Sequence, residues 1–172
     1  LLAYSSIAQA GYLLAGVVCV SVLGRAAVLF YLVVYVCMNL GAFLLAGLIS
    51  DRARSDELAA FAGWGKRWPM AGILMSVLML ALTGLPPTAG FTGKWYLVLA
   101  IWEQATPATQ LAWITLLTLL VLNTVLSLFY YLRLPVMMIF RRPLAIPAGA
   151  GQTAPAAMLL IGLLAVPVLL LG

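Results

Sequence analysis

The sequence predicts an all-α integral membrane protein with five transmembrane helices, the third of which is interrupted at Pro86-Pro87. Three observations support this prediction. Hydrophobic residues make up 66% of the chain and charged residues only 8%, against about 25% charged in a soluble domain. The apolar residues gather in segments of about 20 or more, the length at which a helix spans a bilayer. The longest of these segments contains two adjacent prolines, which a continuous helix excludes.

Five apolar segments correspond to the predicted spans, and they lie at about residues 1–23, 26–49, 68–102, 110–140 and 156–172. We expect a tight connection at Gly24-Arg25 between the first two segments, and a polar loop at 50–67 before the third. The third segment carries one charge, Lys94, and is expected to break near residues 86–90. A loop at 141–155, rich in Pro, Gly and Ala, precedes the last span. All five spans are assigned to a single transmembrane domain.

Composition excludes several classes of function. The chain has no His, and Cys19 and Cys37 lie inside apolar segments without metal-ligand spacing. We therefore expect no metal site, and thiols that pack as small apolar groups. The net charge of +5 lies in short loops rather than on one face, so we expect no nucleic-acid partner. The first residue is Leu1 and no signal-peptide pattern follows, so we expect a fragment of a longer protein.

Two arrangements are consistent with residues 68–102. In one, Pro86-Pro87 forms a surface turn between two separate helices, and Lys94 lies at an interface. In the other, both halves form one span that is interrupted inside the membrane, and Lys94 lies near the membrane interior. The positive-inside rule distinguishes the two arrangements, because cytoplasmic loops carry an excess of Lys and Arg.

The interrupted arrangement gives the stronger charge asymmetry. It leaves Arg25 alone on one side and places seven cations on the other, namely Arg52, Arg54, Lys66, Arg67, Arg133, Arg141 and Arg142. The two-helix arrangement gives four cations against five, so the loop charges favour neither orientation of the chain in the membrane. We therefore favour the interrupted span, with loop 50–67 cytoplasmic and the C-terminus outside.

Lys94 is the candidate site in this arrangement. Backbone that leaves a helix inside a membrane is tolerated where it is buried or lines a cavity, and such breaks are typical of ion and proton sites. A lysine at that depth costs at least about 2.5 kcal/mol. Lost hydration and the positive end of the second half-helix disfavour the ammonium, whereas free carbonyls at the end of the first half-helix favour it. Lys94 is therefore a candidate proton carrier, and a side chain that extends to the interface is the alternative.

Polar side chains inside the spans are candidates for a supporting path. The ones that we select are Gln9, Tyr35, Asn39, Thr92 and Asn123. Taken one at a time, hydrogen bonding between helices is the more common role of such residues. For most of the tyrosines in the spans we expect a position at the membrane interface, and these are Tyr4, Tyr12, Tyr31, Tyr35, Tyr130 and Tyr131.

Four stretches, in order, resemble the antiporter-like subunits of bacterial NADH–quinone oxidoreductase, which is respiratory complex I. They are LAYSSIAQAGY at 2–12, LFYL at 29–32 with MNLGAF at 38–43, GLPPTAGFTGKWYL at 84–97, and YYLR at 130–133. Within that family the series is most similar to subunit N. The resemblance covers about residues 1–142, and the specificity lies in the combination of the four stretches rather than in any one of them.

The resemblance implies a fold of fourteen helices, of which this chain would supply the last five. It implies a proton-translocating membrane subunit of the respiratory chain, in which the lysine matching Lys94 belongs to a chain of buried charges and waters. The chain would be part of an enzyme without redox chemistry of its own. NADH, FMN, iron–sulfur clusters and quinone would all be bound elsewhere in the complex.

The same resemblance implies a multi-pass protein of the bacterial inner membrane, with the lipid bilayer and the other membrane subunits as partners. Two positions depart from the family. Many relatives carry His at the position of Gln9, and sister subunits can carry Lys near the position of Asn39. Neither Gln nor Asn titrates, so proton relay at these two positions is in question.

Two other functions stay open at this point. One is a subunit of a related cation/proton antiporter or membrane-bound hydrogenase. The other is a membrane scaffold that conducts no ion, in which Lys94 would sit in a dry cavity and its ammonium would reach an interface.

Overall fold

Residues 2–142 and 155–172 are described in the computed structural model, and all of their regular elements are helices. The elements are α1 (Leu2–Val18), α2 (Val22–Ala53), the 3₁₀ helix η1 (Leu58–Phe61), α3 (Trp64–Arg67), α4 (Pro69–Thr83), α5 (Ala89–Glu103), α6 (Gln110–Phe140) and α7 (Pro155–Leu170). The all-α prediction is confirmed. Most of the loop predicted at 141–155 lies outside the described residues.

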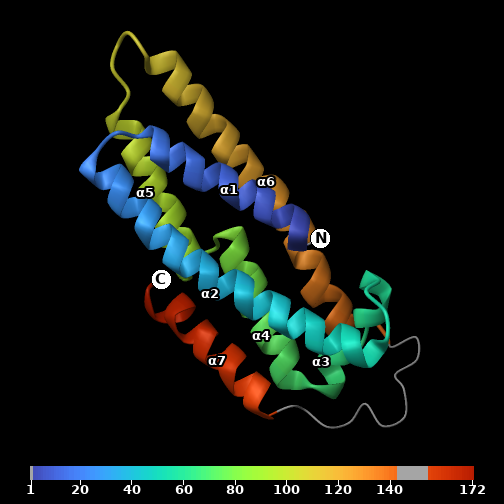
Figure 1. Cartoon of the computed structure of the whole chain (residues 1–172). Coiled ribbons are helices and arrows are strands. Elements are labelled where there is room, and N and C mark those ends of the chain that lie inside the picture. Colours follow the sequence, from blue (N-terminus) through green and yellow to red (C-terminus); the bar gives the residue numbers. More distant parts are fainter. Residues whose placement is uncertain (1, 143–154) are drawn as a thin grey trace.

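The helix α2 is the long element against which most of the others pack. It contacts α1, α4, α5 and α7, while α6 lies alongside α4 (Figure 1). Within the described residues, α2 and α6 are long and apolar enough to cross a membrane, and α1, α4 and α7 are apolar but shorter.

The helices α4 and α5 follow α2 one after the other, in the opposite direction. Leu45 and Ile49, near the end of α2, share a buried apolar cluster with residues of α4. Ala27 and Tyr31, near the beginning of α2, share a second cluster with Leu97 of α5. The two halves therefore lie along successive parts of α2 rather than returning on each other as a hairpin (Figure 1).

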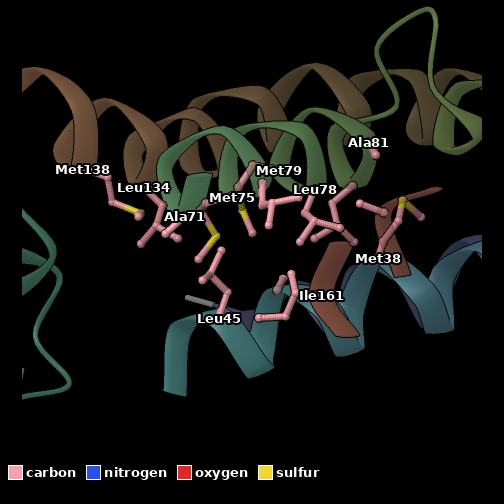
Figure 2. Close-up of a cluster of buried hydrophobic side chains, with 14 of the residues drawn as sticks. Met38, Leu45, Ala71, Met75, Leu78, Met79, Ala81, Leu134, Met138 and Ile161 are labelled. Atoms are coloured by element: carbon pink, nitrogen blue, oxygen red, sulfur yellow. The ribbon is translucent and has the colours of Figure 1, made fainter. Parts of the chain in front are cut away.

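The main apolar core surrounds α4, which is enclosed by α2, α6 and α7. Methionines supply much of the contact, with Met38 from α2, Met75 and Met79 from α4, and Met138 from α6 (Figure 2). All four are 0% exposed. Unbranched thioether side chains fill irregular gaps between helices, so this packing does not depend on regular ridges and grooves.

The turn between α1 and α2 lies earlier than predicted. The helix α1 ends at Val18 and α2 begins at Val22, so Gly24 and Arg25 lie in the first turn of α2 instead of forming the connection. The physical reason is the N-cap, because the Ser21 hydroxyl accepts the N–H of Gly24 at 2.9 Å. Serine is a strong N-cap residue, so it defines the start of the helix more sharply than glycine does.

The polar stretch predicted as loop 50–67 is partly helical. It contains the last turn of α2, which ends at Ala53, together with η1 and α3. Arg54 closes α2 in a left-handed conformation, with φ of 53°, and its N–H donates to the Ser50 carbonyl. The Ser50 hydroxyl also hydrogen-bonds to Asp56, which ties the turn to the end of the helix.

Candidate functional site

The chain leaves helical geometry between α4 and α5, at residues 84–88. Gly84 follows α4 with φ of 85° and ψ of 49°, in the left-handed region that glycine adopts without steric penalty. Its N–H donates to the carbonyls of Leu80 and Ala81, each at 3.0 Å. Thr88 then leads into α5 in an extended conformation. Gly84 is therefore the residue that ends α4.

Two carbonyls in the last turn of α4 lack helical partners, and the two prolines that follow cannot supply them. In an α-helix the carbonyl of residue i accepts the N–H of residue i+4. The carbonyls of Leu82 and Thr83 would therefore accept from residues 86 and 87, which are both proline and carry no N–H. A buried carbonyl without a donor is costly, so both oxygens need a donor from another part of the molecule.

Lys94 of α5 is that donor. Its Nζ donates to the Leu82 carbonyl at 3.1 Å and to the Thr83 carbonyl at 2.8 Å. The side chain is only 7% exposed, and Nζ lies 4.5 Å from the centre of the Tyr12 ring, within the range of a cation–π contact. The amine is therefore held by the negative end of α4 and by one aromatic face.

Two glycines allow the close approach that this contact requires. A Cβ added at Gly84 would lie 2.8 Å from Cδ of Lys94, so a larger residue would collide with the lysine stem. A Cβ added at Gly90, in the first turn of α5, would overlap the backbone carbonyl of Ala81. Lys94 can therefore reach the carbonyls of α4 because the backbones of α4 and α5 pack closely against each other.

Gln9 of α1 shares an acceptor with Lys94. Its Nε2 donates to the Leu82 carbonyl at 3.0 Å and to the Tyr131 hydroxyl at 3.0 Å, and its Oε1 accepts from the Tyr31 hydroxyl. The Tyr131 hydroxyl also hydrogen-bonds to Ser5. One buried hydrogen-bonded network therefore joins α1, α2, α4 and α6 beside the lysine.

Tyr12 completes the surroundings of the amine. Its ring faces Lys94, and its hydroxyl donates to the Leu120 carbonyl of α6 at 3.0 Å and hydrogen-bonds to Thr124 at 2.6 Å. The Tyr12 side chain thus bridges α1, to which it belongs, and α6, to which its hydroxyl is hydrogen-bonded. Because the hydroxyl is engaged away from the lysine, the amine meets the π face of the ring.

No carboxylate lies close to Lys94 on its own helix. The nearest acid on α5 is Glu103, nine positions along, which corresponds to about 13 Å of helix at 1.5 Å per residue. The other acids of the chain, Asp51, Asp56 and Glu57, lie at the end of α2 and just beyond it. Within the described residues, His, Cys, Asp and Glu form no group of three or more that could hold a metal ion.

The structure brings together only some of the residues that the sequence selected. Lys94 and Gln9 meet at the Leu82 carbonyl. Asn123 lines a surface hollow together with Ser5, near the far end of the Gln9 network. Among the described residues, no side-chain hydrogen bond connects Tyr35, Asn39 or Thr92 to that network, and the buried Oδ1 of Asn39 has no partner.

The expectation that most tyrosines lie at the membrane interface is wrong for three of them. Tyr31 and Tyr131 are 0% exposed and Tyr12 is 3% exposed, because each places its hydroxyl on a partner in another helix. Tyr4, by contrast, is 81% exposed. The three buried tyrosines and Ser5 are the site residues that sequence reasoning did not select.

Comparison with known proteins places the chain among membrane subunits of one kind. Residues 1–127 match the family described as "NADH:quinone oxidoreductase/Mrp antiporter, TM". NADH-quinone oxidoreductase subunit N of Anaeromyxobacter sp. is 38% identical over the whole of this chain and 33% of its own length. The corresponding subunit of Moorella thermoacetica is 46% identical over 77% of this chain and 26% of its own length.

A solved structure agrees with the sequence matches. A chain of respiratory complex I from Thermus thermophilus, with bound aureothin, superposes with a TM-score of 0.80 and 33% identity. The match covers 99% of this chain and 36% of that chain. This chain thus spans about a third of the length of the relatives that it matches. These matches confirm the resemblance drawn from the four sequence stretches.

Proposed function

The chain belongs to the NADH:quinone oxidoreductase/Mrp antiporter transmembrane family, and on that premise we propose that it is part of a proton-translocating membrane subunit of a complex I-type NADH–quinone oxidoreductase. In this proposal Lys94 carries protons at the break between α4 and α5. The observation that carries it is the contact of the buried amine with two carbonyls that Pro86-Pro87 leave free. NADH, FMN, iron–sulfur clusters and quinone belong to other subunits of the complex.

The proposal includes five membrane spans, with α4 and α5 as two halves of the third. Support comes from the way α4 and α5 follow successive parts of α2, since a surface hairpin would bring α5 back along α4. The loop charges then orient the chain in the bacterial inner membrane, with residues 50–67 cytoplasmic and Gly172 outside.

The geometry is suited to an amine that changes charge. A charged lysine has three N–H donors and a neutral one has two, so the two carbonyls can hold the side chain in either state. The third position, toward Tyr12, then gains and loses the proton. Two charge-assisted hydrogen bonds of about 1.5–3 kcal/mol each oppose a burial cost of at least about 2.5 kcal/mol, so the two carbonyls offset part or all of the cost of burying the ammonium.

The test is Lys94→Met in the subunit that contains this chain, within the assembled complex. Methionine keeps an unbranched apolar stem but removes the amine, so we expect NADH-driven proton pumping in proteoliposomes to fall by most of its value. Lys66→Met is the matched control, since Lys66 is exposed on α3, and it should pump as the wild type does. Undiminished protons per electron in an assembled Lys94→Met complex would contradict the proposal.

A second candidate function follows from the family description, which includes Mrp antiporters. A subunit of a cation/proton antiporter would use the same lysine but would couple the proton to a metal cation. Transport by membrane vesicles that depends on sodium and not on NADH would favour this function. A non-conducting scaffold is less well supported, because the ammonium ends on buried carbonyls of α4 rather than on an exposed surface.

A further inference from the structure

We propose that Gln9 is a positioning residue for Lys94, acting through the Leu82 carbonyl that both side chains use. The inference rests on the proposed function and adds a control of the charge state of the amine. It starts from two distances, 3.0 Å from Gln9 Nε2 to the Leu82 oxygen and 3.1 Å from Lys94 Nζ to the same oxygen. A carbonyl oxygen has two lone pairs, so the two donors together fill it.

The orientation of the Gln9 amide follows from its neighbours. The Leu82 carbonyl can only accept, so the NH₂ group of the amide must face it. The amide oxygen therefore faces Tyr31, whose hydroxyl must donate to it. The second N–H of the amide donates to the Tyr131 hydroxyl, which also shares a hydrogen bond with Ser5. Gln9 is 1% exposed, and these contacts leave it one orientation.

The shared oxygen couples Gln9 to the charge of the lysine. The Gln9 N–H draws on the same electron density that stabilises the ammonium, so the Leu82 oxygen is a weaker acceptor for Lys94 than it would be alone. Because hydrogen bonds to the charged form favour that form, Gln9 moderates how strongly the protonated lysine is held. Release of the proton from Lys94 is therefore easier with Gln9 than without it.

Other titratable groups around the amine do not compete with this effect at neutral pH. The phenols at the site are Tyr12 on α1, Tyr31 on α2 and Tyr131 on α6, and Tyr35 on α2 and Tyr130 on α6 lie near Tyr131. Phenols ordinarily titrate near pH 10. The helices α4 and α7 contain no titratable residue, and α5 adds Tyr96 and Glu103 on its own length.

The experiment measures the pH dependence of proton pumping by the assembled complex in proteoliposomes, for three substitutions at one position. Gln9→Leu removes the competing donor, and we expect its pumping profile to move to higher pH by up to about one unit, the equivalent of one hydrogen bond. Gln9→Glu has the shape of the amide but places a carboxylate near the ammonium, so its shift should be larger in the same direction. Gln9→His offers a ring N–H to Leu82 in either charge state but adds a positive charge when protonated, so its profile should approach that of the wild type at alkaline pH, where the ring is neutral.

Ser6→Ala is the matched control on the same helix, because the Ser6 hydroxyl donates to the Leu2 carbonyl of its own helix. It should leave the pH profile unchanged. Ser5→Ala disturbs the network without touching the Leu82 carbonyl, so its shift should be smaller than that of Gln9→Leu. An equal shift in Ser5→Ala would overturn the proposal, since disturbance of the network would then suffice. If Gln9→Leu fails to assemble, Gln9→Glu decides, and an unshifted profile there also overturns it.

Lys94→Met measured in parallel separates this inference from the proposed function. Full pumping by Lys94→Met would overturn both. Loss of pumping in Lys94→Met together with an unshifted profile in Gln9→Leu would overturn the positioning role of Gln9 alone.

Discussion

The chain leaves helical geometry at two comparable places, between α1 and α2 and between α4 and α5, and the two treat their free backbone groups differently. At the first, residues 19–21 close the turn locally. The N–H of Cys19 donates to the Gly16 carbonyl at 3.1 Å, and Ser21 caps the new helix with its own side chain. The donors and acceptors come from the turn itself and the helix ends beside it.

At the second place, the local sequence cannot close the break. Proline at 86 and 87 removes the N–H groups that the carbonyls of Leu82 and Thr83 would use, and Lys94 supplies donors from the following helix. The two breaks differ in the chemical groups that complete their hydrogen bonds. At the first break, none of these groups titrates. At the second break, a titratable side chain donates to the backbone carbonyls, so its charge state changes the strength of those hydrogen bonds.

Among the changes that test this contrast, we expect the largest effect at Gly90, where the break brings the backbones of α4 and α5 together. Gly90→Ala places a methyl group on the Ala81 carbonyl, so we expect a loss of about 3 kcal/mol in stability through overpacking. Thermal denaturation of the purified complex, with retention of the subunit as the readout, measures it.

Gly11→Ala on α1 is the control for this prediction, because no atom lies within 4 Å of its added Cβ. It should be neutral or slightly stabilising, since alanine favours a helix. A Gly90→Ala complex as stable as the wild type would mean that α4 and α5 are farther apart than described.

A smaller effect is expected when the two breaks are made chemically alike. The double variant Pro86→Ala with Pro87→Ala restores two N–H groups that can compete for the carbonyls of Leu82 and Thr83. Competition by one neutral hydrogen bond should weaken the binding of the Lys94 amine to these two carbonyls about two- to tenfold. Pumping should therefore fall without being abolished. Protons per electron in the assembled complex measure the change.

Pro69→Ala is the control for the double variant, because Pro69 occupies the first turn of α4, where its missing N–H has no helical partner anyway. Its pumping should equal that of the wild type. Unchanged pumping in the double variant would show that the prolines do not reserve the carbonyls for the lysine.

The smallest effect is expected at the turn between α1 and α2, at residues 19–21. Ser21→Ala removes the N-cap of α2 and should lower stability by about 1 kcal/mol. Pumping per assembled complex should be unaffected, because the Ser21 hydroxyl bonds to Gly24 and, among the described residues, shares no hydrogen bond with the Gln9 network. Ser6→Ala on α1 is the matched control, since that hydroxyl only donates to its own helix at Leu2. Reduced proton translocation by Ser21→Ala would remove the functional distinction between the two breaks.

The all-helical fold could be predicted from the sequence, because it depends on local chemistry. Apolar segment length indicates helices in lipid, and Pro86-Pro87 excludes a continuous helix wherever it lies. The same local reasoning missed the turn at residues 19–21, because a glycine was given more weight than the serine that caps the helix.

The tyrosine network could not be predicted in the same way. Ser5 and Tyr131 are 126 positions apart, and Gln9 and Tyr131 are 122 apart. Which face of each helix turns inward depends on packing between helices, and a helix that is apolar on all sides gives no periodic signal for it. Tyr31 and Tyr131 therefore looked like interface residues, although packing buries them.

Lys94 and both of its carbonyl acceptors come from residues 82–94, one unbroken run of the chain. Recombination that exchanges segments between related genes would therefore transfer the amine together with the two carbonyls that it contacts. Gln9 lies on α1, more than seventy positions away, and would be inherited separately. In the roles proposed for them, Gln9 can therefore change while the carbonyls that hold Lys94 stay the same, so proton release from the lysine can be tuned without rebuilding its site.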